Sequence, residues 1–333
     1  MVGAGIAGLC LARELARSGC QVTVLADPSA PSASTAAAGL LQIAGGRISA
    51  VHLGLRQSCL AYFSEFLDGL DGAPRLRGRG HLRLGGDARS RAGFVSTLGG
   101  QGIVAKDCSQ ELLRQMEPSL SCDGGVWLGN DSVDPSALLE ALEKELGSLS
   151  VVAQSGRAQK LAARGVVDSA GQIWEADVVA LACGAGLGLL YEPGWGFREE
   201  AGWGATYTGE IGLACSVEGL GQTLVPVTSQ RWRIGGSTPW QDKPPLQAWV
   251  AWKGAEVSRV AAVRCAAPDG LPLAGAIGKN AYLLGGLGRN GLLTAPLLAK
   301  GLAQQILTGQ APSWLAPFSP GREGVGHRRS WSR

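Results

Sequence analysis

The residues with the clearest chemical meaning are three glycines near the start of the chain, in the run Gly3-Ala4-Gly5-Ile6-Ala7-Gly8. Gly3 permits a tight turn, Gly5 lets the backbone approach a pyrophosphate, and Gly8 lets the following helix pack close to a strand. Each role requires the absence of a Cβ atom. The amides that begin the helix at Ile6 would face the phosphates, which the positive end of the helix dipole favours. The run therefore predicts a turn that holds a dinucleotide.

The elements around this turn appear in the order that a βαβ unit requires. A helix is expected after the glycines because apolar residues recur at helical spacing and charged residues occupy a polar side. The apolar positions are Leu9, Leu11 and Leu15, and the polar ones are Arg13, Glu14 and Arg17. Ser18-Gly19 then ends the helix, and Gln21 to Leu25 has the pattern of a strand. This order supports a motif that is weak by itself in a chain with 51 glycines.

Two features depart from the usual unit. The acidic residue that binds the ribose is expected about twenty residues after the turn, where Ala26 stands and Asp27 follows. A shift of one residue would let Asp27 serve. Only Met1 and Val2 precede Gly3, whereas a strand usually has about five or six residues. We therefore expect residues upstream of Met1 to complete a central strand and to increase stability and cofactor occupancy.

Two later segments also end apolar strands in glycine. Asp177 to Ala185 is an apolar run that ends at Gly184, which suits a backbone that meets a cofactor. Ala281 to Pro296 contains a second strand, a glycine turn and the start of a helix, which Gly309 ends. The helix N-terminus near Gly291 offers amides and a positive dipole to an anionic group.

Arg264 is the candidate substrate-binding residue. It follows the apolar run Val260 to Val263, and an unpaired guanidinium would be costly to bury there, so an anionic partner is expected. A substrate carboxylate fits because the planar fork of arginine donates two parallel hydrogen bonds. The alternative is a structural ion pair, for example with Asp269. Arg289, in the second glycine turn, is the other candidate.

Composition excludes several classes of protein. The chain has 333 residues, of which 45% are hydrophobic and 17% charged. It contains neither an apolar run of the length that a membrane helix needs nor a signal peptide, so we expect a cytoplasmic protein. A net charge of +3 gives little support for nucleic-acid binding. With three histidines and eight cysteines without a CxxC pair, no metal site and no Ser-His-Asp hydrolase are expected.

The length suits two interleaved domains of an α/β protein. The dinucleotide-binding domain is expected in the segments 1–70, 131–194 and 259–320. An antiparallel-sheet α+β domain for the substrate is expected in 71–130 and 195–258. Residues 321–333 read as a disordered basic tail. Within the second domain, the alternation around His81 predicts a strand with a solvated polar face.

Three motifs together resemble the D-amino-acid oxidase (DAO) superfamily of FAD enzymes over nearly the whole chain. They are the N-terminal GAGIAG, the strand end around Ala182-Cys183-Gly184, and the C-terminal GLGRNGLLTAP. Within this family, Val263-Arg264 before the run 268–275, and Arg289-Asn290-Gly291, resemble glycine oxidase. The stretch 285–306 also resembles the FAD domain of the enzyme that modifies wobble uridine in tRNA.

The resemblance implies a Rossmann-type FAD-binding domain of the GR2 kind and places the cofactor along a series of segments. They are Val2, Gly3, Gly5, Ile6, Ala7 and Gly8 at the diphosphate turn, Asp27 at the ribose, Thr35, Ala36, Ala37, Ala38, Gly39 and Leu40 beside the isoalloxazine, Ala158 at the adenine, Cys183 and Gly184 at the ADP half, and Gly288, Arg289, Asn290, Gly291 and Leu292 at the flavin pyrimidine. The second glycine turn favours FAD over NAD, because a nicotinamide domain does not need it. Thr223 stands where the family has an active-site tyrosine.

The reaction implied is hydride transfer from the carbon beside an amine nitrogen to flavin N5, which gives an imine that hydrolyses. Oxygen or a quinone would reoxidise the flavin. The substrate is expected to be a small amine or amino acid. One alternative is a tRNA-modifying flavoenzyme that acts on an aminomethyl uridine, which a salt-dependent shift of tRNA would reveal. Another is a flavin-free binding or scaffold protein, which a yellow purified protein would contradict.

Overall fold

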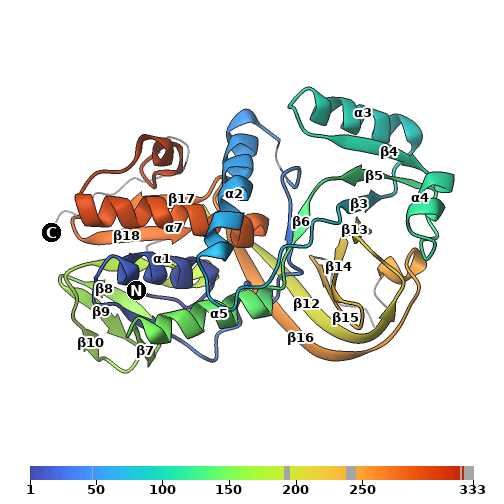
Figure 1. Ribbon diagram of the computed structural model, residues 1–333. Helices are drawn as coiled ribbons and strands as arrows, with labels where there is room; N and C mark the ends of the chain where they lie inside the picture. Colours follow the sequence, from blue (N-terminus) through green and yellow to red (C-terminus); the bar gives the residue numbers. More distant parts are fainter. Residues whose placement is uncertain (47, 191–195, 238–244, 323–324, 326–333) are drawn as a thin grey trace.

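A computed structural model describes residues 1–46, 48–190, 196–237, 245–322 and 325. The helices are α1 (Ile6–Arg17), α2 (Ala50–Asp68), α3 (Ala88–Gly99), α4 (Gln110–Met116), α5 (Pro135–Ser148), α6 (Leu187–Leu190) and α7 (Gly291–Thr308). In Figure 1, α1, α5 and α7 lie with a small sheet on one side of the molecule, and a large sheet lies on the other with α3 and α4.

The small sheet is the parallel core of the dinucleotide-binding half. Its strands are β1 (Thr23–Ala26), β7 (Val152–Ser155), β11 (Val179–Leu181), β17 (Leu273–Ala276) and β18 (Ala281–Gly285). β1 pairs in parallel with β7, β11 pairs in parallel with β18, and β17 closes the edge antiparallel to β18.

Val2 joins the two parts of this sheet. It forms parallel bridges to Leu25 in β1 and to Leu181 in β11. Its N–H donates to the carbonyl of Ala180 at 2.9 Å, and its own carbonyl accepts from the N–H of Ala182 at 2.8 Å. The central position of the sheet is therefore filled by a very short extended segment that is hydrogen-bonded on both sides.

The helices pack around this sheet through one apolar core. Buried side chains of α1, α2, α5 and α7 form its centre, including Leu11, Phe63, Leu142 and Leu298. Asp134 caps α5 by accepting from the N–H of Ser136, and Pro135 is the first helical residue.

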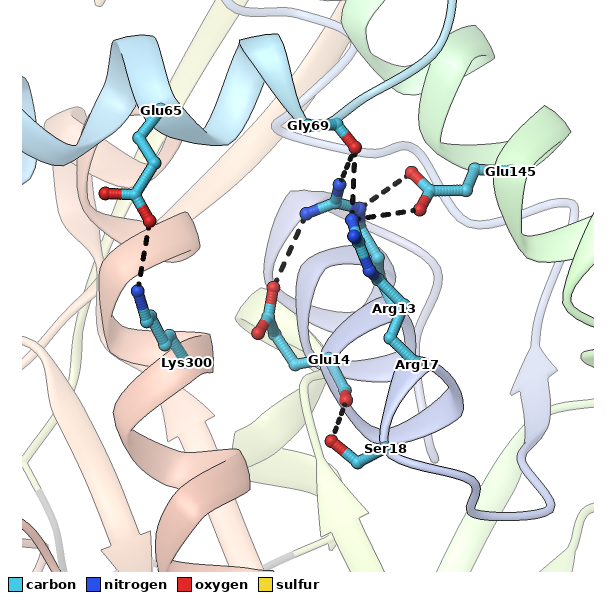
Figure 2. Close-up of polar contacts among 8 residues, drawn as sticks. All are labelled: Arg13, Glu14, Arg17, Ser18, Glu65, Gly69, Glu145 and Lys300. Atoms are coloured by element: carbon cyan, nitrogen blue, oxygen red, sulfur yellow. Dashed lines mark hydrogen bonds and ion pairs between the residues drawn. The ribbon is translucent and has the colours of Figure 1, made fainter.

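A polar network lies where α1, α2 and α5 meet (Figure 2). Arg13, expected on the polar side of α1, is only 2% exposed, because α2 and α5 cover that side. Its Nε donates to Glu145 Oε2 at 2.7 Å, and its Nη2 donates to the carbonyl of Gly69. Arg17 contacts the same two residues from a more exposed position. Arg13 thus lies on the polar side of α1, as the sequence predicts, but this side is buried at Arg13.

The large sheet has the strand order β16-β12-β15-β14-β13-β3-β5-β4. Its strands are β3 (His81–Leu84), β4 (Ala105–Ser109), β5 (Gly124–Leu128), β12 (Arg198–Ile211), β13 (Ser216–Gly219), β14 (Gln222–Thr228), β15 (Arg231–Gly236) and β16 (Trp252–Ala266). All neighbours are antiparallel except β3 and β13, which are parallel, so the sheet is mixed. β14 and β15 form a hairpin.

Smaller elements complete the fold. β8 (Ala158–Ala162), β9 (Gly165–Asp168) and β10 (Ile173–Trp174) form an antiparallel meander. β2 (Leu40–Leu41) pairs with β6 (Asp131–Ser132) where the chain passes between the two halves. The expected α/β class with a dinucleotide-binding part and a sheet-rich part is confirmed.

The division into domain segments stays a proposal. The continuous strand β16 crosses the expected boundary at 258/259. The start of the expected disordered tail is held in place: Arg322 makes a two-pronged pair with Asp269 at 2.8 and 2.9 Å, and Val325 is 1% exposed. The prediction was wrong for these residues, because a carboxylate and an apolar core lie within their reach. The rest of the tail, 323–324 and 326–333, lies outside the described residues.

Candidate cofactor site and active site

A cavity of about 1260 Å³ lies between the dinucleotide-binding half and the large sheet. Its wall includes the candidate residues Val2, Gly3, Gly5, Ile6, Ala7, Asp27, Thr35, Ala36, Ala37, Ala38, Gly39, Leu40, Ala158, Cys183, Gly184, Arg264, Gly288, Arg289, Asn290, Gly291 and Leu292. Gly8 is the candidate that lies behind the wall. Residues from seven separate stretches of the chain thus converge on one space.

The three glycines of the first turn have different steric roles. Gly3 has a φ of +103°, and a Cβ there would overlap the carbonyl of Ala182. A Cβ on Gly8 would overlap the carbonyl oxygen of Gly3. At Gly5 the nearest atom to an added Cβ is Ser34 Oγ at 3.3 Å. Gly3 and Gly8 are therefore required by the fold, whereas an added Cβ at Gly5 would only press on the Ser34 hydroxyl, at the wall where a pyrophosphate is expected.

Two helices begin at the cavity wall without a side-chain cap from their own N-cap residue. Gly5 precedes α1 and Asn290 precedes α7. The N–H of Ile6 donates to Ser34 Oγ at 3.0 Å, so a hydroxyl oxygen from the neighbouring loop supplies the acceptor there. Two positive helix ends face one cavity, which suits a ligand with anionic groups. Sequence reasoning gave the Ser34 hydroxyl no such role, since the role depends on how the loop folds back.

Asp27 lies directly after β1 at the same end of the cavity. Its Oδ1 accepts from the N–H of Ser29 at 2.9 Å and from the hydroxyl of Ser29 at 2.6 Å. These hydrogen bonds lower the pKa of the Asp27 carboxyl, so it stays ionised and can accept from a ribose hydroxyl. Arg157, beside Ala158, also lines this end.

The two cysteines in the cavity wall are unreactive, protonated thiols. Burial raises the pKa of Cys183 to about 12 and that of Cys265 to about 11. Because the thiolate is the reactive form, neither residue is a nucleophile near neutral pH. In the described part of the chain, no group of three His, Cys, Asp or Glu side chains is arranged to hold a metal ion.

Arg264 projects from β16 into the wall on the large-sheet side. Its Nη2 donates to Ser237 Oγ at 2.6 Å, and its buried Nε has no hydrogen-bond partner among the described residues. Burial first, and then the cation of Arg289, lower the pKa of the guanidinium, while Glu200 opposes them. The guanidinium therefore has unused hydrogen-bonding capacity and would be stabilised by an added anion.

One possible structural partner of Arg264 is paired elsewhere. Asp269, which the sequence suggested for a structural ion pair, binds Arg322 instead, through two hydrogen bonds. Arg322 also donates to the carbonyls of Leu271 and Pro272. The ion pair of Arg264 with Asp269 was thus a wrong expectation, because the chain end returns to cover Asp269.

Arg289 is held from behind by Glu218, a residue that the sequence did not single out. Arg289 Nη2 lies 3.5 Å from Glu218 Oε1, and Gln42 Nε2 donates to Glu218 Oε2 at 3.0 Å. Both Gln42 and Arg289 line the cavity. Glu218 thus connects two polar groups of the wall and offsets the charge of Arg289.

His81 lies behind Glu218 and is 1% exposed. Its Nε2 is 3.5 Å from Glu218 Oε2, and burial lowers its pKa to about 4 although Glu218 opposes this shift. The ring is therefore neutral near neutral pH. The expected solvated face was wrong for His81, which is buried, although Arg83 on the same face of β3 is exposed.

Thr223 in β14 and Trp203 in β12 complete the wall near Arg264. A threonine hydroxyl thus lies where the family resemblance leads one to expect a phenol. No described helix combines the length and the apolar composition that a bilayer span requires.

Comparison with known proteins agrees with this arrangement. Residues 1–305 match the model of the DAO family, described as FAD dependent oxidoreductase. Glycine oxidase from Geobacillus kaustophilus has a similar structure, with a TM-score of 0.82, 20% identity and 97% of each chain covered. Iminodiacetate oxidase from Chelativorans sp. BNC1 has a TM-score of 0.77 and 19% identity, covering 96% of this chain and 98% of that one.

Two curated proteins are similar in sequence, both named tRNA 5-methylaminomethyl-2-thiouridine biosynthesis bifunctional protein MnmC. The one from Caulobacter vibrioides is 28% identical over 94% of this chain and 55% of its own length. The one from Maricaulis maris is 29% identical over 97% of this chain and 54% of its own length. The chain thus spans about half the length of these relatives. From the match over residues 1–305, the chain belongs to the DAO family of FAD-dependent oxidoreductases.

Proposed function

We propose that this enzyme oxidises the C–N bond of a small amino acid or secondary amine to an imine that hydrolyses. The observation that carries the proposal is Arg264, a guanidinium in the cavity wall whose buried Nε has no partner among the described residues. A substrate carboxylate would supply the missing acceptor. Arg289 adds a second cation to the same cavity.

The cavity fits FAD because Gly5 and the N-termini of α1 and α7, neither of which is capped by its own N-cap side chain, lie along one wall. The turn from Val2 to Gly8 would hold the diphosphate and Asp27 the ribose. The loop Thr35 to Leu40 and the turn Gly288 to Leu292 would hold the flavin. When bound, FAD supplies the hydride acceptor.

The protein side chains would then orient the substrate. The fork of Arg264 fixes a carboxylate through two parallel hydrogen bonds, which sets the direction of the Cα–H bond. Ser237 holds one Nη of that fork. We assign no side chain as a base, because an amine that binds neutral needs none. Oxygen or a quinone would serve as the final electron acceptor.

The first experiment is a substrate panel with the FAD-loaded enzyme. Glycine, sarcosine, proline and D-amino acids are mixed with the enzyme without oxygen, and loss of flavin absorbance reports the reductive step. Oxygen or a quinone is then added to the reduced enzyme to identify the acceptor. If no amine or amino acid on the panel bleaches the flavin, the proposal fails.

The second experiment changes Arg264 to Lys, which keeps the charge and loses the fork. KM for carboxylate-bearing amines should rise by about tenfold or more, since hydrogen bonds between charged groups are the strong ones. KM for amines without a carboxylate should change little. Arg259→Lys is the matched control, because Arg259 lies on the same strand and pairs with Glu256. Unchanged kinetics on amino acids together with lost stability would make Arg264 a structural residue.

A second candidate function is supported by the two curated relatives, whose names refer to tRNA modification. A carboxymethylaminomethyl group on a wobble uridine also joins an amine, a methylene and a carboxylate, so Arg264 would suit it equally. The net charge of +3 gives this candidate little support. If this candidate is right, tRNA should show a salt-sensitive gel shift with the enzyme, and the modified tRNA should bleach the flavin. A small-molecule oxidase should show neither effect.

A further inference from the structure

A buried cation lies between the large sheet and the loop that lines the cavity. Arg233 in β15 is 4% exposed, and burial lowers the pKa of its guanidinium. Among the described residues, no Asp or Glu forms an ion pair with it. Instead its N–H groups donate to oxygens from three other segments. Such a site requires each donor to find an acceptor.

Two of these acceptors are backbone carbonyls of the cavity loop. Nε donates to the carbonyl of Ala37 at 3.0 Å, and Nη2 donates to the carbonyl of Thr35. Nη1 donates to Ser136 Oγ at 3.0 Å and to Thr206 Oγ1 at 3.3 Å. One side chain therefore joins β15, β12, the first turn of α5 and the loop.

The loop also rests directly on the backbone of the large sheet. A Cβ on Gly204 would overlap the carbonyl oxygen of Ala36, and a Cβ on Gly235 would lie 3.4 Å from the Cβ of Ala38. The two glycines make room for the loop, and Arg233 holds its carbonyls on either side of this contact. The position of the loop is thus set by the sheet that bears Arg264.

The direction of the Ala37 carbonyl determines where the next amide points. The peptide bonds of the described residues are trans, so the N–H of Ala38 lies on the edge of the peptide opposite the Ala37 carbonyl. It therefore points away from Arg233. Ala38 lines the cavity, and no hydrogen bond of its N–H to another described residue is present.

We propose that Arg233 is a positioning residue for the flavin: it fixes the loop from Thr35 to Ala38 so that the Ala38 N–H is presented to the cavity as a hydrogen-bond donor. The proposal rests on the cofactor role of this loop given above. It makes flavin binding depend on a side chain of the large sheet, which couples the two halves of the enzyme without a contact between Arg233 and the cofactor.

The test compares Arg233→Met and Arg233→Lys with the parent enzyme. FAD affinity is measured by titrating the apoprotein and following flavin fluorescence, and amide hydrogen exchange of residues 33–40 is measured by mass spectrometry on the FAD-loaded protein. We expect Arg233→Met to weaken FAD binding by about tenfold or more and to speed exchange in the loop. Arg233→Lys, which keeps the charge without the planar fork, should show both effects to a smaller degree.

Arg231→Met is the matched control, because Arg231 lies two residues earlier on β15, has a side chain that is 43% exposed and reaches Asp134 at 4.0 Å. It should leave FAD affinity and loop exchange unchanged. If Arg233→Met does not fold, Arg233→Lys carries the test. Unchanged FAD affinity and loop exchange in the folded variants, with or without a lower Tm, would overturn the proposal. Neither measurement requires a substrate, so both can be interpreted even if the proposed reaction is wrong.

Discussion

The two arginines of α1 allow a direct test of how burial changes the free-energy cost of breaking an ion pair with a shared partner. Arg13 and Arg17 both contact Glu145 and both donate to the carbonyl of Gly69 (Figure 2). Their side chains are 3% and 49% exposed, respectively. Replacing each in turn by alanine therefore changes the burial of the lost cation while these two acceptors stay the same, and Arg13 alone also lies 3.5 Å from Glu14 Oε1.

The expected magnitudes follow from these contacts. Breaking a buried pair by removing one partner costs about 3–5 kcal/mol, but Arg17 remains 3.4 Å from Glu145 and lowers that penalty. Arg13 also lies over the ring of Phe66, 5.1 Å from its centroid, and this contact is lost as well. We expect Arg13→Ala to lower the free energy of unfolding by about 2–3 kcal/mol and Arg17→Ala by at most about 1 kcal/mol.

The assay is urea unfolding followed by circular dichroism, with all proteins at the same FAD saturation because bound ligand adds to stability. Midpoints are compared at equal m-values. The effect of Arg17→Ala should disappear in about 1 M salt, whereas that of Arg13→Ala should persist. The double variant Arg13→Met with Glu145→Met removes both buried charges and should recover most of the loss.

Two results would refute this reasoning. If Arg17→Ala destabilises as much as Arg13→Ala, burial does not determine the cost. If the double variant is as unstable as Arg13→Ala, the loss arises from packing and not from an unpaired Glu145.

Three further predictions test the site and its surroundings. Gly5→Ala should leave the Tm of the apoprotein unchanged while weakening FAD binding, whereas Gly8→Ala should lower both, because only the second Cβ overlaps the protein; equal apoprotein Tm values would contradict this. An unfolded histidine is protonated near pH 6.5, whereas burial lowers the pKa of His81 in the folded protein to about 4. Stability should therefore fall by about 2 kcal/mol between about pH 7 and pH 5, and His81→Gln should remove that slope in urea unfolding. Burial raises the pKa of Asp269, but the hydrogen bonds from Arg322 outweigh this and lower it. The stability that ionised Asp269 contributes is present above the ordinary pKa of Asp and is lost as pH falls through the lowered pKa. The Tm of Asp269→Asn should therefore match that of the parent only in strong acid.

Short-range patterns predicted the local elements well. The glycine run marked the turn before α1, Asp134-Pro135 marked the start of α5, and Gly309 marked the end of α7 in a left-handed conformation. These features depend on φ/ψ preferences and capping groups within a few residues, so they can be read without knowledge of the fold. The roles of the cavity residues in holding FAD stay predictions, although their convergence on one cavity agrees with them.

The partners of charged side chains were decided by tertiary structure alone. The sequence correctly placed Arg13 on the polar side of a helix and His81 on one face of a strand, but other elements cover both positions. The local pattern around Arg233 indicates only a strand. Its hydrogen bonds show that its acceptors include the carbonyls of Thr35 and Ala37, about two hundred residues earlier. Arg264 was read as needing an anion, whereas its candidate partner Asp269 is taken by Arg322.

The physical reason is the range of the interactions involved. Periodicity and turn chemistry report a residue's own backbone and its near neighbours, so the sequence by itself determined the βαβ turn, the order of the elements and the class of cofactor. Burial and electrostatics depend on which distant segments cover a side chain. Only the folded chain therefore decided which cations are paired, which histidine is neutral, and which loop the large sheet holds against the cavity.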